Sequence, residues 1–100
     1  MRYNKLVRDG IPQKIEAAGQ TYTAHIADAN EFREKLLAKL VEEAQEIQAK
    51  PSAEDLADLW EVIMAIAEEF KIDLAEVEAA RKRKFEKYGG FSQRIILEES

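Results

Sequence analysis

The fold of this chain is decided by residues 42–58, which read EEAQEIQAKPSAEDLAD. Glu43 and Glu46 lie three residues apart before the proline of this stretch, and Asp55 and Asp58 repeat the same spacing after it. Proline ends a helix and disfavours helical backbone in the residue that precedes it. The stretch therefore predicts two consecutive helices, each carrying a pair of acidic side chains.

Capping signals mark the starts of three long helices. A Ser or Asp followed three residues later by an acidic residue is typical of a helix start. The chain has three such pairs: Asp28 with Glu31, Ser52 with Asp55, and Asp73 with Glu76. We therefore expect helices over Ala29–Ala49, over residues 53–70 and over Leu74–Tyr88, the last ended by Gly89-Gly90.

Shorter elements are predicted around these helices. Pro12 suits the first turn of a small helix over residues 12–18, because Gly19 follows its end. Residues 2–8 are extended in character, and the β-branched and aromatic residues of 21–26 and 91–97 favour short strands. The expected fold class is a mainly α helical bundle with short N- and C-terminal β elements.

Apolar residues at helical spacing predict the core. The first long helix has the stripe Leu36, Leu37, Leu40, Val41, Ala44 and Ile47. The second has the stripe Leu56, Leu59, Val62, Ile63, Ile66 and Phe70. Such stripes are typical of helix faces buried against a neighbouring element, so we expect the two helices to pack on each other through them.

Composition narrows the class of protein. The chain has 100 residues, a formal net charge of −5 and no cysteine. This length is typical of one domain, which we predict over residues 1–100. The negative net charge argues against an open nucleic-acid-binding surface, which needs a basic face. The lack of cysteine excludes disulfides and thiolate metal sites. No signal peptide or membrane-length apolar run is visible, so a cytoplasmic location is expected.

The four acidic residues predict a metal site. On a helical wheel Glu43 and Asp55 fall at or within the apolar stripes, and Glu46 and Asp58 fall on the flanks. Carboxylates three residues apart on one helix face are close enough to each other to bind the same ion. Oxygen ligands without histidine favour Mg²⁺, or Mn²⁺, over zinc or di-iron. The alternative is ordinary surface carboxylates, with Asp55 serving only as a helix cap.

Basic residues at both ends of the chain are candidates for binding phosphate. Lys84 and Lys87 precede the glycine pair, and Lys5 and Arg8 lie near the N-terminus. Positive side chains neutralise charge in phosphoryl chemistry, although lysines at a helix C-terminus also favour the helix dipole. No nucleophile–base arrangement or phosphate-binding glycine motif occurs, which leaves metal-assisted hydrolysis by water.

Three motifs carry a resemblance to a known family. They are YNKLVRD at residues 3–9 with Ile11-Pro12, EEAQE at 42–46 followed by DLAD at 55–58, and Lys84 ahead of Gly89-Gly90-Phe91. Over nearly the whole chain they resemble the all-α nucleoside triphosphate pyrophosphohydrolases. That superfamily includes MazG, the dimeric dUTPases and phosphoribosyl-ATP pyrophosphohydrolase, and the chain is most similar to the small phosphoribosyl-ATP pyrophosphohydrolase-like members. The family signature, EExxE…ExxD, has Glu where this chain has the shorter Asp55.

The resemblance implies a MazG-like homodimer whose helices pack into a larger bundle. It also implies Mg²⁺-dependent hydrolysis of a nucleoside triphosphate to the monophosphate and pyrophosphate, as in nucleotide house-cleaning. Glu43, Glu46, Asp55 and Asp58 would hold the metal, and Glu42 or Glu43 would accept a proton from the attacking water.

Two alternatives stay open at this point. The substrate could be phosphoribosyl-ATP, which would place the enzyme in histidine biosynthesis. Otherwise the chain could be a non-catalytic helical module that binds nucleotide or mediates dimerisation. Assays for turnover and for binding separate these alternatives, and the sequence does not.

Overall fold

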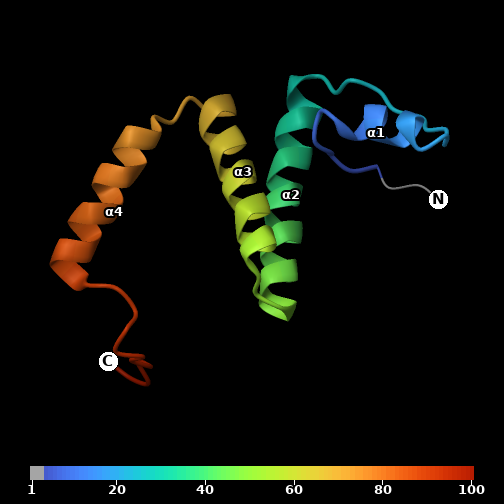
Figure 1. The fold of residues 1–100 in the computed structure, drawn as a ribbon. Helices are drawn as coiled ribbons and strands as arrows, with labels where there is room; N and C mark the ends of the chain where they lie inside the picture. The colour runs from blue at the N-terminus through green and yellow to red at the C-terminus, as the bar shows by residue number, and fades with distance from the viewer. Residues whose placement is uncertain (1–3) are drawn as a thin grey trace.

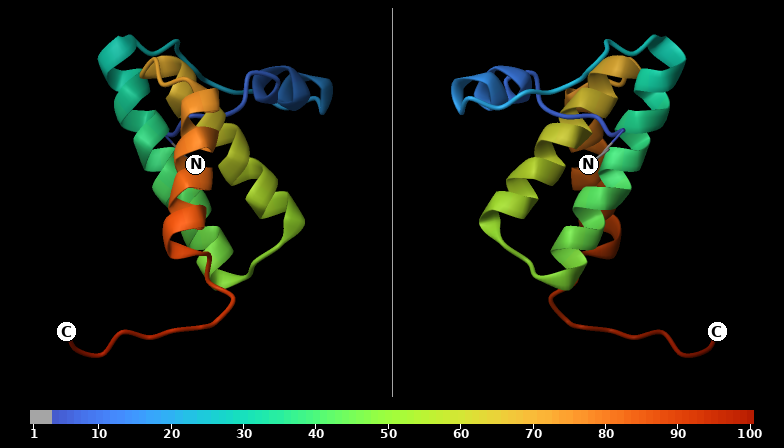
Figure 2. Two further views of the ribbon diagram at one scale, coloured as in Figure 1. Left: turned by 90° about the vertical axis from the view of Figure 1, so that its left-hand side faces the viewer. Right: turned by 90° about the vertical axis from the view of Figure 1, so that its right-hand side faces the viewer.

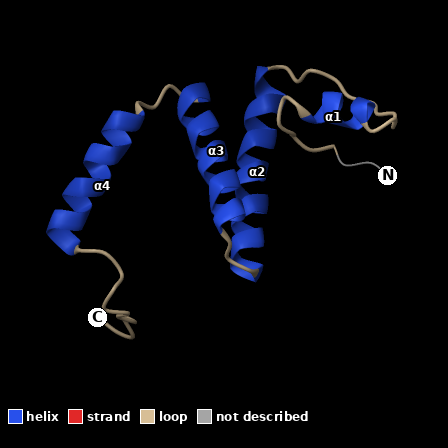
Figure 3. Cartoon of the chain, in the orientation of Figure 1, coloured by secondary structure: helices blue, strands red, loops and turns tan. Residues whose placement is uncertain are grey.

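The computed structural model describes residues 4–100, in which four helices and no strand occur (Figures 1 and 3). The helices are α1 (Ile11–Ala17), α2 (Ala29–Ala49), α3 (Ala53–Glu69) and α4 (Leu74–Tyr88). The prediction of a mainly helical chain is confirmed, and each bound lies within one residue of the predicted position. In the part of the chain described, no helix has the length and apolar character that crossing a bilayer requires.

The helix termini form where the sequence places capping residues. Asp28 and Ser52 each accept a hydrogen bond from the backbone N–H three residues later, at 2.8 and 3.1 Å. Asp73 caps α4 through the N–H two residues later, at 2.8 Å. These bonds satisfy N–H groups that have no partner within the helix. Gly89 ends α4 with a φ of +79°, a left-handed conformation that glycine adopts without strain.

The short strands predicted for residues 21–26 and 91–97 are absent. Both segments are irregular, and no strand occurs anywhere in residues 4–100 (Figure 3). Residues 2 and 3 of the extended segment predicted at the N-terminus lie outside the described residues. A strand needs a neighbouring strand to pair its backbone groups. Residues 21–26 instead connect α1 to α2, and residues 91–97 lead away from the helices (Figure 2).

The structural centre of the chain is an antiparallel hairpin of α2 and α3, joined by residues 50–52 (Figure 1). In the described chain no other pair of helices shares more than an isolated contact. The apolar side chains that are buried in it are Leu36, Val62 and Ala67. The core therefore lies along the seam between these two helices.

The apolar stripes are only partly buried in this seam, contrary to the prediction. Leu36 is 2% exposed, but other stripe residues face solvent in the single chain: Leu37, Val41, Ala44, Leu56 and Phe70. Two helices cover only the narrow strip where they face each other, so a wider apolar face needs a further element to cover it. Within residues 4–100 no such element packs on the hairpin.

The chain is more open than a compact domain of its length. Its radius of gyration is 17.8 Å, whereas a compact domain of this length has about 13 Å. Its accessible surface is 9338 Å², whereas a folded monomer of this mass exposes about 5,800 Å². The excess arises because α1 and α4 diverge from the hairpin instead of packing along it (Figures 1 and 2).

The substitution Leu36→Ala tests the position of the core. We expect it to lower the free energy of unfolding by about 2–5 kcal/mol, because it leaves a cavity in the seam. Urea unfolding followed by circular dichroism measures the loss. Glu34→Ala, at an exposed position of the same helix, is the control and should change the value by less than about 0.5 kcal/mol. Equal losses in both variants would contradict a core centred on this seam.

Candidate metal centre

Carboxylates from both helices of the hairpin meet in two groups that share Glu43. One group joins Glu43 of α2 with Asp55 and Asp58 of α3, and the other joins it with Glu42 and Glu46 of α2. In each group, one oxygen from every residue lies within 4.8 Å of the others. The spacing of three residues puts each pair on one helix face, and the hairpin turn brings the two faces together.

Glu43 is the residue on which the cluster is centred. It is 5% exposed, and its Oε2 atom has no hydrogen-bond partner. Burial raises the pKa of its carboxyl above the ordinary glutamate value, and the negative charge of Glu46 raises it further. The charged form is therefore disfavoured where it lies.

Asp55 serves as a helix cap and also belongs to the cluster. Its Oδ2 atom accepts a hydrogen bond from the Ser52 hydroxyl at 2.9 Å, and its backbone N–H donates to the same hydroxyl at 3.1 Å. Its carboxylate is half-buried and lies in the group with Glu43 and Asp58. The capping role considered in the sequence analysis is therefore real, and it is compatible with a role as ligand.

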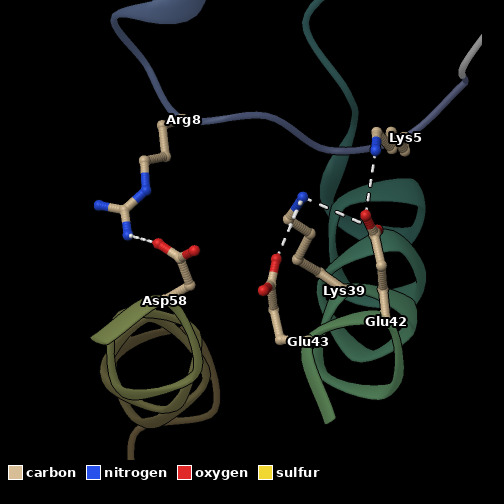
Figure 4. A network of polar contacts seen from close by, with 6 residues as sticks. All are labelled: Lys5, Arg8, Lys39, Glu42, Glu43 and Asp58. Atoms are coloured by element: carbon tan, nitrogen blue, oxygen red, sulfur yellow. Dashed lines mark hydrogen bonds and ion pairs between the residues drawn. The ribbon is translucent and has the colours of Figure 1, made fainter. Parts of the chain in front are cut away.

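Two lysines border the α2 side of the cluster (Figure 4). Lys5 Nζ donates a hydrogen bond to Glu42 Oε1 at 3.0 Å, and this bond lowers the pKa of Glu42. Lys39 Nζ lies 3.7 Å from Glu42 Oε2 and 3.6 Å from Glu43 Oε1. Sequence reasoning missed Lys39. Lys39 precedes Glu42 by three residues and Glu43 by four, which is the spacing at which ion pairs form on a helix. This spacing in the sequence could have identified Lys39.

Arg8 borders the α3 side. Its Nη2 atom donates a hydrogen bond to Asp58 Oδ1 at 2.8 Å. Lys5 and Arg8 were predicted from the sequence to bind phosphate, and the structure brings both to the carboxylate cluster. The segment that carries them crosses over the two helices (Figure 4).

The other two predicted phosphate-binding residues lie elsewhere. Lys84 and Lys87 are exposed on α4, which does not pack along α2 or α3. Lys87 Nζ lies 5.2 Å from the centroid of the Tyr88 ring, a cation–π contact. In the single chain these lysines are therefore not part of the cluster.

The donor set has the chemistry that a hard divalent cation requires. Mg²⁺ and Mn²⁺ prefer carboxylate oxygens, and an unpaired buried carboxylate is costly unless a cation neutralises it. The unpartnered Oε2 atom of Glu43 is therefore an observation, independent of the number of acidic residues, that points to a ligand. A cation here would also reduce the repulsion between Glu43 and its neighbours.

Comparisons with protein-family models, with curated proteins and with solved structures found no match to this chain. The interpretation of the cluster therefore rests on its own geometry and on the motifs described above.

The substitution Glu43→Gln should stabilise the cation-free protein at pH 7, because it removes a buried charge. The pKa of Glu43 in the folded protein is raised. At pH values above that pKa the carboxyl is ionised, and it destabilises the folded protein to the full extent. As the pH falls from the folded-state pKa toward the ordinary glutamate pKa of the unfolded chain, Glu43 becomes protonated in the folded protein before it does so in the unfolded chain. The destabilising effect of its charge therefore disappears over this interval. The stability difference between wild type and Glu43→Gln should shrink over that interval. Urea unfolding with a chelator present, repeated across this pH range, measures it.

Saturating Mg²⁺ should reverse the order of stability, because a cation that binds only the folded state stabilises the wild type more than the variant. Glu61→Gln, which removes a charge from an exposed position on α3, is the matched control and should follow the wild type throughout. A wild type that is unaffected by Mg²⁺ would contradict the metal centre.

Proposed function

We propose that the protein is a Mg²⁺-dependent nucleoside triphosphate pyrophosphohydrolase of the MazG-like, all-α type, which converts a triphosphate and water to the monophosphate and pyrophosphate. The observation that carries the proposal is the buried carboxylate of Glu43, whose Oε2 atom has no hydrogen-bond partner and which is grouped with Asp55 and Asp58 across the hairpin. The motif resemblance supplies the substrate class.

Glu43, Glu46, Asp55 and Asp58 are the proposed metal ligands. Mg²⁺ bound there would supply charge neutralisation on phosphate oxygens and a more acidic water. Glu43 belongs to both carboxylate groups, whereas Glu46 is grouped with the α2 glutamates alone. Asp55, although shorter than the glutamate of the family signature, offers an oxygen to the group with Glu43 and Asp58.

Of the two candidate proton acceptors, we favour Glu43 over Glu42. Lys5 and Lys39 hold the Glu42 carboxylate, and the hydrogen bond from Lys5 lowers its pKa, which makes it a weak base. Glu43 is less tightly held, because its Oε1 atom lies 3.6 Å from Lys39 Nζ and its Oε2 atom has no hydrogen-bond partner, so this second oxygen is available to accept a proton. Lys5 and Arg8, which lie beside the same cluster, are proposed to neutralise the polyphosphate.

The proposal is tested by the release of pyrophosphate from a panel of standard and modified nucleoside triphosphates and phosphoribosyl-ATP, with and without Mg²⁺. We expect turnover that requires Mg²⁺. Substituting a group that only supports a metal ligand typically lowers activity about 10- to 100-fold. Glu43 is proposed as a ligand itself, so Glu43→Gln should lower the activity by about 100-fold or more. Glu61→Gln should retain full activity.

Equal activity of wild type and Glu43→Gln would refute the assigned role of Glu43. Nucleotide binding without any product over hours would instead favour the non-catalytic module, and selective turnover of phosphoribosyl-ATP would favour the biosynthetic enzyme.

We further propose that the working form is a homodimer, as the resemblance implies. The single chain exposes 9338 Å², roughly 3,500 Å² more than a compact monomer of its mass. Two chains together therefore carry an excess of roughly 7,000 Å², which is enough for the roughly 2,000–5,000 Å² or more that obligate dimers bury in total, about 1,000–2,500 Å² from each chain. Residues Leu56, Trp60 and Met64 follow each other at intervals of four along α3, and all three are exposed. This spacing forms one continuous apolar stripe, which a second copy would cover.

The substitution Trp60→Glu should convert the dimer to a monomer, because it places a charge in the middle of this stripe. Sedimentation equilibrium of wild type and variant at equal concentration measures the change. Glu61→Gln is again the control, since it lies beside the stripe and should leave the mass unchanged. A wild type that sediments as a monomer at micromolar concentration would overturn the proposed assembly.

A further inference from the structure

We propose that residues 4–9 form a cationic strap that holds the carboxylate cluster in the cation-free protein, and that Arg8 releases Asp58 when a divalent cation binds. The inference rests on the metal site of the proposed function, but it does not depend on hydrolysis. It assigns Arg8 two alternating partners, Asp58 in the free protein and the anionic ligand of the cation-loaded protein.

The strap spans the two helices that build the cluster. Lys5 Nζ binds Glu42 of α2 at 3.0 Å, and Arg8 Nη2 binds Asp58 of α3 at 2.8 Å (Figure 4). Three residues of extended chain reach about 10 Å, enough to bridge neighbouring helices. The strap leads directly into α1 through a turn, in which the backbone N–H of Ile11, the first residue of α1, donates to the carbonyl of Arg8 at 3.1 Å. It is attached to the cluster through the side chains of Lys5 and Arg8.

Arg8 and a divalent cation compete for one carboxylate. Asp58 belongs to the group of oxygens formed with Glu43 and Asp55, yet its Oδ1 atom already accepts the Arg8 hydrogen bond. Arginine keeps its charge at every relevant pH, so it opposes a cation on the same carboxylate at close range. Asp58 can offer a cation its second oxygen, but the guanidinium then lies close to the bound ion, and the repulsion between the two positive charges favours release of Arg8.

The ion pair is weak enough to exchange. The side chains of Arg8 and Asp58 are 56% and 43% exposed, and exposed pairs contribute little free energy in water. Lys39 differs, because its side chain is only 19% exposed and it lies on the same helix as its partners. We infer that Lys39 remains with the glutamates while Arg8 exchanges. While Lys5 keeps its hydrogen bond to Glu42, the released guanidinium three residues further along the strap stays near the cluster, where it can pair with phosphate oxygens.

Calorimetric titration with Mn²⁺ tests the strap without measuring activity. We expect Arg8→Gln to bind Mn²⁺ about two- to fivefold more tightly than wild type, the range that follows from removing an exposed competing ion pair. Circular dichroism verifies that the variant keeps its helix content. The matched control is Arg33→Gln, which removes the same charge from an arginine that is similarly exposed and pairs with Glu69 at 3.6 Å.

The Arg33→Gln control separates competition between Arg8 and the cation for Asp58 from the effect that removing any one positive charge would have on Mn²⁺ affinity. Arg33 lies ten residues before Glu43, about 15 Å along α2, which is beyond the screening length of about 8 Å at physiological salt. Its substitution should leave Mn²⁺ affinity unchanged. Equal or weaker binding by Arg8→Gln than by wild type would overturn the strap, as would equal tightening in both variants.

Limited trypsin digestion of the wild type provides a second readout. Mn²⁺ should accelerate cleavage after Arg8 relative to cleavage after Arg94 in the exposed C-terminal tail, because the Arg8 side chain becomes available. An unchanged ratio would contradict release. If neither wild type nor variant binds Mn²⁺, the strap and the metal site both fail. If both bind Mn²⁺ but no nucleotide is hydrolysed, the strap is retained and only the enzymatic proposal fails.

Discussion

The structure depends on one electrostatic constraint, the carboxylate of Glu43 held between two helices with an unpaired oxygen. Burial and the charge of Glu46 both oppose its ionisation, and Lys39 at 3.6 Å offsets this only in part. A buried carboxylate of this kind is tolerated when positive charge lies close to it. Lys39 supplies this charge to Glu43, and Lys5 and Arg8 pair with the neighbouring carboxylates of Glu42 and Asp58.

The positive charges around the cluster differ in how firmly they are held. Lys39 is on the same helix as its partners, so its ion pairs form whenever α2 forms. Lys5 and Arg8 reach their partners across 37 and 50 residues of sequence, through side chains that are partly exposed. Contacts of this second kind between exposed side chains contribute little free energy and are easily exchanged.

The openness of the chain has a related physical cause. A hairpin of two helices buries a narrow seam, here Leu36, Val62 and Ala67, and leaves the remaining apolar faces in contact with water. A radius of gyration of 17.8 Å is large for 100 residues, and hydrophobic burial is the dominant driving force for closing such a structure. The exposed stripe of α3 and the divergence of α4 are both accounted for if the bundle is completed by a second chain.

The helices were predictable because their signals are local. Helix period, the capping residues Asp28, Ser52 and Asp73, and the break at Pro51 each act within a few residues. The sequence by itself therefore determined the bounds of the three long helices to within one residue, and the pairs of carboxylates on the faces of α2 and α3. The predicted strands failed because pairing is not local, and no partner strand lies beside them in residues 4–100.

The tertiary structure alone decided three features of the candidate site. Glu43 is the carboxylate common to both groups. Arg8 donates a hydrogen bond to Asp58, and Lys84 and Lys87 lie on a helix apart from the cluster. Each depends on how elements far apart in sequence are placed in space. Local propensity carries no information about that placement, because it results from the packing of the hairpin and the path of the segments that leave it.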